Sequence, residues 1–491
     1  MKVKRIVFLL YITGLCLMFV YWYHGSGSLF SRQNTTAARK LKAILPKTTL
    51  PESSKSAKQI PRTTERKIKS IWKKSTLPEK STSTKQIPWT TDNLKPQVLK
   101  SAKFEPGNQC AVNLSWPNGR DEWQILDNNI TFVYSAFAVP LENQVKIMGI
   151  HRIRIRPKRH YVCWFYNDTQ NVSQLQTNGT ISLLHDHHGR TYGSMMVTCP
   201  LKDNYNWNAV AVSISVIDTP LNYMVLHYPE KQIKRNFTIC LSVMHSKYSK
   251  VLELIETFEF DKALGANHFV LYHRSSAKQS NVVLNHYIKS GELTLLNYTL
   301  PIPPKGIHYF GQITAVNDCV YRSRGISRYV LVVDIDEILI PYQFNNWMSM
   351  MDNLTASNPN ASAFMFRNTF FDTSMPDDIR RFRLGDKATR YKLKKFLKVW
   401  REDFIFGYCN RCKTLVMPEW IDKMAIHRTE RIKGDHTPLR VNKSVALLHH
   451  YRRYGSSQAR VFNAQTRKYS GIVVGRVIKT YEKLKPCVPD L

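Results

Sequence analysis

The sequence is poor in acidic residues, and it lacks the motifs that would link its basic charge to nucleic acid. Only 36 Asp and Glu stand against 71 Lys and Arg, so the formal net charge is +35. No zinc-finger spacing and no aromatic RNP pattern accompanies this charge. The C-x-x-C of Cys409 and Cys412 has no second cysteine pair to complete a zinc site. We therefore expect no nucleic-acid partner, and we expect a loop disulfide at this motif.

Charged residues are absent from residues 6–23, close to the N-terminus. As a helix, this stretch spans roughly 27 Å, which suits a thin bilayer. Lys2, Lys4 and Arg5 precede it, and positive residues favour the cytoplasmic side of a membrane. No clear small-residue cleavage site follows. The pattern predicts a cytoplasmic tail at 1–5 and a transmembrane signal anchor at 6–23, with a cleaved signal peptide as the alternative.

Large apolar residues are sparse over residues 24–103, which are rich in Lys, Ser, Thr and Pro. This tract holds much of the excess positive charge and contains a tandem repeat. TLPE occurs at 49–52 and 76–79, and KQIP occurs at 58–61 and 85–88. A polar repeat punctuated by proline buries too little surface to fold. We expect a disordered basic stalk at 24–103.

Two further patterns indicate a lumenal, oxidising environment for the rest of the chain. Eight cysteines follow the anchor, an even number that suits disulfides, although the sequence does not give their connectivity. Eleven N-x-S/T triplets without a central proline are candidate glycosylation sites. They begin at Asn34, Asn113, Asn129, Asn167, Asn171, Asn178, Asn236, Asn297, Asn353, Asn360 and Asn442.

From about residue 104 to 235, short runs rich in β-branched and aromatic residues alternate with turn residues. This pattern predicts a small all-β domain. Cys163 and Cys199 lie on two of the expected strands and could form a disulfide. The cluster at 185–188, which reads His-Asp-His-His, resembles a metal site. Because Gly189 follows and strands flank both sides, we interpret it as a hairpin loop.

From 236 to 491 the pattern changes to alternating strands and helices. Strands are expected at 237–244, 268–273 and 293–298, and helices at 250–264, 282–289 and about 311–324. Such alternation is typical of an α/β fold with a parallel, doubly wound sheet. In this class of fold, ligands bind at the carboxyl ends of the strands.

The most informative segment is a strand that ends in two aspartates. Residues 330–333 are an apolar, β-branched run, and Asp334 and Asp336 follow it. In extended backbone this spacing places both carboxylates on one side. Two carboxylates at the carboxyl edge of a sheet suit a hard divalent cation, which can in turn hold a diphosphate. The segment therefore predicts an enzyme with a phosphorylated or nucleotide-activated substrate.

Polar residues at the ends of neighbouring elements are the candidates for binding the nucleotide. They lie on the helix before the aspartate strand and at the ends of the first two strands of the α/β part. The helix and the residues after it contribute Gln312, Ala315, Asn317, Asp318, Arg322 and Arg324, and the strand ends contribute Met244, His245, Tyr272 and His273.

The segment QITAVNDCVYRSRGISRYVLVVDIDEILIP, residues 312–341, resembles the signature of glycosyltransferase family 92. The resemblance extends over most of 236–485 and includes 264–276, 411–427 and 446–452. It implies a GT-A-like, Rossmann-type nucleotide-sugar domain in a type II protein of the Golgi membrane, with that domain in the lumen. It also implies a metal-dependent, inverting transfer of galactose from UDP-galactose to a sugar of an N-glycan, with a β-1,4 linkage.

The resemblance also implies roles for single residues. Asp334 and Asp336 become ligands of Mn²⁺ or Mg²⁺ and of the diphosphate. A late histidine, His450 or else His427, adds to the metal site, and Glu337 either supports the ligands or caps a helix. An inverting reaction also needs a carboxylate base. The candidates, among which the sequence does not choose, are Glu402, Asp403, Glu419 and Asp372.

Two other functions fit parts of the same pattern. A haloacid-dehalogenase-type phosphatase also ends a hydrophobic strand in aspartate-x-aspartate, with Asp334 as the nucleophile here. That motif requires a threonine where this chain has Ile338, and it usually comes early in its domain. A lumenal glycan-binding protein with an inactive catalytic core is the other alternative, although the intact pair of Asp334 and Asp336 argues against lost activity.

Overall fold

The computed structural model describes residue 114 and residues 121–155, 160–167, 175–201, 207–454 and 459–488. All of them belong to one compact unit, Lys100–Leu491. The expected cytoplasmic tail, anchor and stalk lie outside the described residues. Within the described ranges, no helix is both long enough and apolar enough to cross a membrane.

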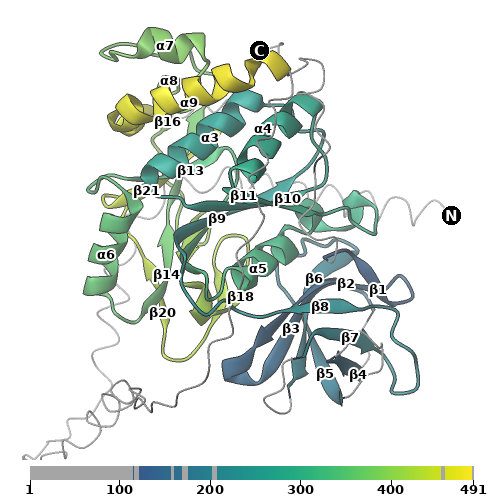
Figure 1. The fold of residues 1–491 in the computed structure, drawn as a ribbon. Coiled ribbons are helices and arrows are strands. Elements are labelled where there is room, and N and C mark those ends of the chain that lie inside the picture. The colour runs from purple at the N-terminus through teal and green to yellow at the C-terminus, as the bar shows by residue number, and fades with distance from the viewer. Residues whose placement is uncertain are drawn as a thin grey trace, which may run out of the picture. The chain divides into compact units, whose positions relative to one another are not determined.

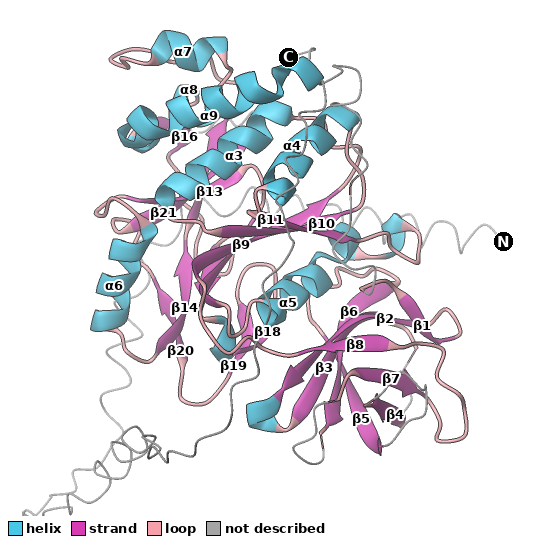
Figure 2. Cartoon of the chain, in the orientation of Figure 1, coloured by secondary structure: helices cyan, strands magenta, loops and turns pink. Residues whose placement is uncertain are grey.

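The first described part is all β, as its sequence predicts (Figures 1 and 2). Its strands follow the order β1-β2-β3-β6-β5-β4-β7-β8, and β8 also pairs with β2, so the sheet closes on itself. Residues of β4 and β6 form the expected disulfide between Cys163 and Cys199. The strands are β1 (Gln124–Asp127), β2 (Thr131–Val139), β3 (Gln144–Arg152), β4 (Tyr161–Tyr166), β5 (Leu175–Leu183), β6 (Tyr192–Pro200), β7 (Ala209–Ser213) and β8 (Met224–His227).

The histidine cluster at 185–188 lies in the hairpin loop between β5 and β6, which pair antiparallel. In the described part of the chain, no group of three or more His, Cys, Asp or Glu side chains is arranged to hold a metal ion. The interpretation of this cluster as a loop is confirmed.

The second part is mixed α/β and is built on a seven-stranded sheet of order β11-β10-β9-β12-β17-β14-β20. Its first four strands are parallel, whereas β17 is antiparallel to both β12 and β14. The near-continuous apolar runs of β9, β10 and β12 are typical of parallel strands that are covered on both faces. The strands are β9 (Arg235–Met244), β10 (His268–His273), β11 (Leu293–Asn297), β12 (Ser327–Val333), β14 (Ala361–Phe366), β17 (Lys413–Val416) and β20 (Thr437–Arg440).

A smaller five-stranded sheet continues from the turn after β12, in the order β13-β21-β15-β16-β22. Its first pairing is antiparallel and sets Glu337 opposite His450. A separate hairpin joins β18 to β19. These strands are β13 (Glu337–Pro341), β15 (Asn368–Asp372), β16 (Trp400–Glu402), β18 (Ile421–Met424), β19 (Thr429–Ile432), β21 (Ala446–Arg452) and β22 (Arg460–Phe462).

Helices cover both faces of the large sheet (Figure 1). Helices α3, α4 and α9 lie on one side, and α5 lies on the other, between the sheet and the β barrel. The α-helices are α3 (Val251–Leu264), α4 (Lys278–Lys289), α5 (Gln312–Arg322), α6 (Trp347–Ser357), α7 (Gly385–Arg390), α8 (Lys394–Leu397) and α9 (Ser470–Leu484). Short 3₁₀ turns are η2 (Pro140–Glu142), η3 (Pro304–Gly306), η4 (His308–Gly311), η5 (Pro418–Trp420), η6 (Gln465–Tyr469) and η7 (Lys485–Cys487).

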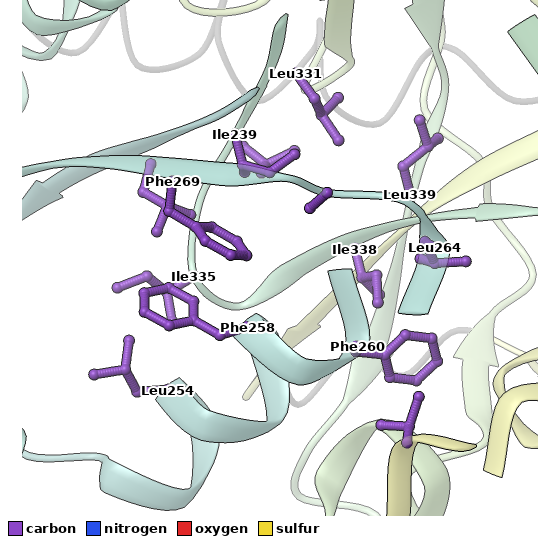
Figure 3. Packing of buried hydrophobic residues seen from close by; sticks show 14 of the residues in the cluster. Ile239, Leu254, Phe258, Phe260, Leu264, Phe269, Leu331, Ile335, Ile338 and Leu339 are labelled. Atoms are coloured by element: carbon purple, nitrogen blue, oxygen red, sulfur yellow. The ribbon is translucent and has the colours of Figure 1, made fainter. Parts of the chain in front are cut away.

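The main hydrophobic core lies between α3 and the sheet (Figure 3). Phe258 of α3 stacks on Phe269 of β10 at a ring-centroid distance of 4.3 Å. Ile338 and Leu339, which directly follow the aspartate turn, belong to the same buried cluster. Each such side chain stabilises the fold by about 1.5–3 kcal/mol through burial. The core therefore fixes the turn from both of its ends.

Helix α5 joins the barrel to the sheet through buried polar contacts. The Ser135 hydroxyl of β2 donates to Asp318 at 2.5 Å, and the Thr314 hydroxyl donates to the Gly149 carbonyl at 3.1 Å. A disulfide between Cys240 and Cys319 ties the same helix to β9. Because α5 is held on both sides, the residues at its first turn have a fixed position beside the ends of β9 and β12.

Candidate functional site

Asp334 and Asp336 lie in the tight turn between β12 and β13, where the Glu337 N–H donates to the Asp334 carbonyl at 3.1 Å. This turn borders a cavity of about 450 Å³ at the carboxyl ends of β9 and β12. The position agrees with the rule for ligands of doubly wound sheets. The lining residues are Ser242, Val243, Met244, His245, Tyr248, Lys250, Glu253, Tyr309, Gln312, Asp334, Ile335, Asp336, His450, Arg452 and Arg453.

The Asp334 carboxylate is held from two sides. The Lys413 ammonium lies 3.0 Å from one of its oxygens, and the Gln312 amide donates to the other at 3.2 Å. Burial alone would raise the pKa of Asp334, but the charge and hydrogen bond of Lys413 outweigh it and lower the pKa to about 2. Asp334 is therefore ionised throughout the physiological pH range.

Lys413 is a site residue that the sequence did not reveal. Its ammonium is buried and also lies 3.2 Å from Glu337, so the two carboxylates raise its pKa against the effect of burial. Lys413 is the first residue of β17, and it reaches the turn only because β17 pairs antiparallel with β12. No local motif marks this lysine, because the contact spans 79 residues of sequence.

Glu337 connects the remaining groups of the turn. One of its oxygens accepts a hydrogen bond from the Asp334 N–H at 2.9 Å, and the other lies 3.2 Å from Nδ1 of His450. It therefore supports the site rather than capping a helix. Nε2 of His450 lies 3.4 Å from Asp336. Burial lowers the pKa of His450, but Asp336 and Glu337 together raise it to about 9.

The two candidate metal histidines have different surroundings. His450 lines the cavity beside Asp336. His427 is hydrogen-bonded through Nδ1 to the Cys412 carbonyl at 3.0 Å, and burial and the nearby Lys413 lower its pKa. The sequence predicts Asp334, Asp336 and a histidine as metal ligands. Because Asp334 is paired with Lys413, only Asp336 and His450 are available to a cation among the described residues.

Aromatic side chains on two strained loops complete the cavity wall. His245 stacks on Phe310 at 4.0 Å, and Tyr309 is 63% exposed at the rim. Tyr309 and Phe310 both have positive φ, which costs free energy in residues with a side chain. The Tyr248 hydroxyl is buried at the cavity and has no hydrogen-bond partner among the residues that the structure describes. These groups offer a stacking face and a free donor to a ligand.

Several residues expected to bind the donor are used elsewhere. Tyr272 is buried and its hydroxyl donates to Asp318, and Asp318 also forms an ion pair with Arg322 at 3.0 Å. Asn317 bonds to the backbone of β18, at Met424. Among the described residues, the lining of the cavity includes none of these four side chains, and it also lacks His273, Ala315 and Arg324. Helix periodicity explains the correction, because most of this polar face of α5 points to the barrel.

Of the expected donor-binding residues, Gln312, Met244 and His245 line the cavity. Gln312 is the first residue of α5 and therefore lies beside the strand ends. Burial lowers the pKa of His245, and the neighbouring Arg274 lowers it further.

The four candidate bases lie away from the cavity, as far as the described residues show. Asp372 is buried and forms an ion pair with Arg460 at 2.9 Å, and Glu402 is buried on the same arginine at 3.6 Å. Asp403 is exposed beside a different pocket, and Glu419 accepts from the backbone of Gly325 at the opposite end of β12. The geometry therefore provides no support for any of them as the base in this conformation.

The C-x-x-C motif does not form the expected disulfide. Cys409 and Cys412 are free thiols in the described structure, and Cys412 is buried. Its thiol donates to the His427 carbonyl at 2.6 Å, and burial raises its pKa to about 11. The motif thus shapes the loop before Lys413 as a pair of thiols.

Comparisons with known proteins match this part of the chain. The model for "Glycosyltransferase family 92" matches residues 235–484. The "Beta-1,4-galactosyltransferase galt-1" of Caenorhabditis elegans is 23% identical over 299 residues. This match covers 58% of the present chain and 63% of that relative, which is less than two thirds of its length.

Solved structures give only a slight likeness. The UDP complex of TarS 1-349 from S. aureus has a TM-score of 0.20 and 13% identity, over 30% of this chain and 39% of that one. Glucosyl-3-phosphoglycerate synthase from Mycobacterium tuberculosis has a TM-score of 0.22 and 11% identity, over 52% of this chain and 80% of that one. At these TM-scores the likeness carries no argument about ligand or mechanism.

Proposed function

Because the chain belongs to glycosyltransferase family 92, over residues 235–484, we propose that it transfers galactose from UDP-galactose to a sugar of an N-glycan. We further propose inversion at the anomeric carbon and a β-1,4 linkage, since a galactosyltransferase is among its relatives. The family assignment sets aside the phosphatase alternative. The strand order, with parallel β11-β10-β9-β12 followed by antiparallel β17, supports a GT-A-like fold.

The observation that carries the proposal is the aspartate turn at the cavity. Asp334 and Asp336 border about 450 Å³ of space at the carboxyl ends of parallel strands. Asp334 is kept ionised and fixed in place by Lys413 and Gln312, and the side chains of Asp334 and Asp336 are each about one-third exposed. Two carboxylates held in this way are suited to a divalent cation, which would in turn hold the diphosphate of a nucleotide sugar.

A divalent cation fits the residues at the turn. Asp336 would supply a carboxylate oxygen, and His450 would supply Nε2 after this nitrogen releases its proton on metal binding. Glu337 would orient the histidine by accepting a hydrogen bond from Nδ1, as carboxylates commonly do beside a metal-binding histidine. When bound, the cation supplies Lewis-acid stabilisation of the departing diphosphate. Diphosphate oxygens and water would complete its coordination.

The chain's own residues hold the donor. Tyr309 offers an aromatic face to the base, and the Tyr248 hydroxyl offers a hydrogen bond to a ribose or phosphate oxygen. Arg452 and Arg453, which line the cavity next to His450, add positive charge near the diphosphate. None of the four carboxylates expected from the sequence lines the cavity among the described residues, so the geometry does not single out a base for the proton of the acceptor hydroxyl.

A lumenal location in the Golgi is part of the proposal. Disulfides at Cys163–Cys199 and Cys240–Cys319 suit an oxidising compartment. Eight of the sequons lie in the described residues, and none of these eight asparagines is buried. They are Asn129, Asn167, Asn178, Asn236, Asn297, Asn353, Asn360 and Asn442.

The test is a panel of UDP-sugars offered to the full chain with Mn²⁺ and N-glycan acceptors. We expect transfer from UDP-galactose, loss of transfer in EDTA, and loss in Asp334→Asn. Asp352→Asn, which changes an exposed aspartate on α6, is the matched control and should retain activity. Transfer from another UDP-sugar would contradict the donor assignment. Glycan binding without any transfer would support an inactive glycan-binding protein instead.

A further inference from the structure

A second, larger cavity lies on another side of the same unit. It is a groove of about 960 Å³, roughly twice the volume of the cavity at the aspartate turn. One wall is the outer surface of the barrel, with side chains of β3, β5 and β6. The other wall is η5 and the β18–β19 hairpin of the α/β part. The groove is therefore built by the junction of the two parts.

The groove is separate from the aspartate turn. Arg324, which lines it, precedes β12, whereas Asp334 follows the same strand. At about 3.3 Å per residue, β12 alone places roughly 20 Å between the two positions. The described lining residues of the two cavities do not overlap. A ligand in the groove would therefore leave the aspartate turn accessible.

Arg324 is the first sign of a ligand. Its side chain is 4% exposed, and its guanidinium packs on the Tyr321 ring at 3.5 Å. Nε donates to the Pro418 carbonyl at 3.1 Å and Nη2 to the Ile421 carbonyl, both of them neutral acceptors. Nη1 is buried and has no hydrogen-bond partner among the described residues. A buried donor of this kind requires an acceptor, and a guanidinium favours an anionic one.

The charge around Arg324 agrees with an anionic ligand. Burial lowers the pKa of Lys433 in the groove, and the positive charge of Arg324 lowers it further, against the effect of Glu142. Asp422 forms an ion pair with Lys146 at 3.3 Å, and Lys433 forms one with Glu142, so these four charges compensate one another. The lining includes five cationic and three carboxylate side chains, which are Lys146, Arg324, Lys423, Arg431, Lys433, Glu142, Glu419 and Asp422.

Trp420 is the second sign. Its indole is 40% exposed at the groove and is stacked on the His436 ring at 3.9 Å, which restricts its movement. Across from it, the hydroxyl groups of Thr180, Ser182 and Thr198 lie on the barrel wall. A fixed aromatic face opposite hydroxyl and charged groups suits a sugar ring, which has an apolar face and a polar edge.

We infer that this groove is a second glycan-binding site, which takes an oligosaccharide bearing an acidic sugar, with the carboxylate at Arg324 and a sugar ring on Trp420. The inference does not depend on which donor sugar the enzyme uses, because it concerns binding alone.

The test is the binding of a fluorescently labelled biantennary N-glycan to the full chain in detergent, with and without terminal sialic acid. We expect the sialylated form to bind more tightly. Trp420→Ala and Arg324→Gln should each weaken that binding by about tenfold or more. Phe404→Ala changes an aromatic that is 50% exposed outside the groove and should have no effect. Asp336→Asn should also bind the glycan normally.

Three results would overturn the inference. The first is that both glycans bind equally and Trp420→Ala binds as well as the wild type. This result does not require Arg324→Gln to fold. The second is loss of binding in Asp336→Asn, which would place the glycan at the aspartate turn. The third is competition by UDP at the groove. Groove binding without galactosyl transfer would contradict the proposed function and leave this inference standing.

Discussion

Replacement of Lys413 by methionine tests the electrostatic basis of the aspartate turn. The ammonium of Lys413 is only 2% exposed and lies within 3.2 Å of both Asp334 and Glu337. In Lys413→Met both carboxylates lose this counterion, and Glu337, itself 2% exposed, retains His450 as its nearest partner. We therefore expect the variant to be strongly destabilised at neutral pH.

The magnitude follows from the pKa of Asp334 and from burial. A decrease from 3.8 to about 2 corresponds to about 2 kcal/mol, which is an upper value because the carboxylate is 31% exposed. The removal of one partner from a buried ion pair typically costs 3–5 kcal/mol. We expect a loss of about 3–5 kcal/mol in the free energy of unfolding, measured by urea denaturation at pH 7.

The matched control is Lys262→Met. Lys262 also lies beside two carboxylates, at 3.3 Å from Glu259 and 2.7 Å from Glu292, but its side chain is 23% exposed. Solvent screens such a pair, so we expect a loss of about 1 kcal/mol or less. Adding Glu337→Gln to Lys413→Met should restore part of the lost stability, because it removes one unpaired charge. Equal losses in the two lysine variants would refute the reasoning.

Three further predictions concern the donor, the pH dependence and the core. Tyr309→Ala should raise KM for the UDP-sugar by about tenfold through loss of base stacking, and a change confined to the acceptor KM would contradict this. Burial raises the pKa of Asp261 from 3.8 to about 8 in the folded protein. The stability that its protonated form contributes is therefore fully present below pH 3.8 and is lost as the pH rises through 8. Between pH 6 and 7.5 the unfolding free energy should fall by about 1.4 kcal/mol per unit from this group, and Asp261→Asn should remove that slope from thermal melts. Phe258→Ala should cost about 3–5 kcal/mol in urea, against less than about 0.5 kcal/mol for exposed Ile472→Ala.

Local patterns were sufficient to predict most of the elements. The strand expected at 268–273 matches β10, and the helix expected at 250–264 matches α3 within one residue. These elements have strong periodicity and clear boundaries, so the local sequence determines them. The same holds for Asp334 and Asp336, whose place at the carboxyl end of β12 follows from a run of β-branched residues and a two-residue spacing.

The rest of the site depends on contacts between distant segments. Lys413 reaches Asp334 only through the pairing of β17 with β12, and His450 reaches Glu337 only through β21 and β13. Asp318 shows a second limit of the sequence. Its polar side chain on α5 suggested a ligand contact, whereas in the structure it accepts a hydrogen bond from Ser135 of the barrel. A single sequence gives the register of a helix face but not the partner that this face meets.

The central claim is that Asp336, in the turn after β12, holds the diphosphate of a UDP-sugar through a divalent cation. The most direct measurement compares the initial rates at which the wild type and Asp336→Asn transfer galactose from UDP-galactose in Mn²⁺. Equal melting temperatures of the two proteins would show that the variant is folded. We predict a rate that is lower by about a hundredfold or more in the variant, together with weaker UDP binding. An Asp336→Asn protein with the wild-type rate would contradict the account.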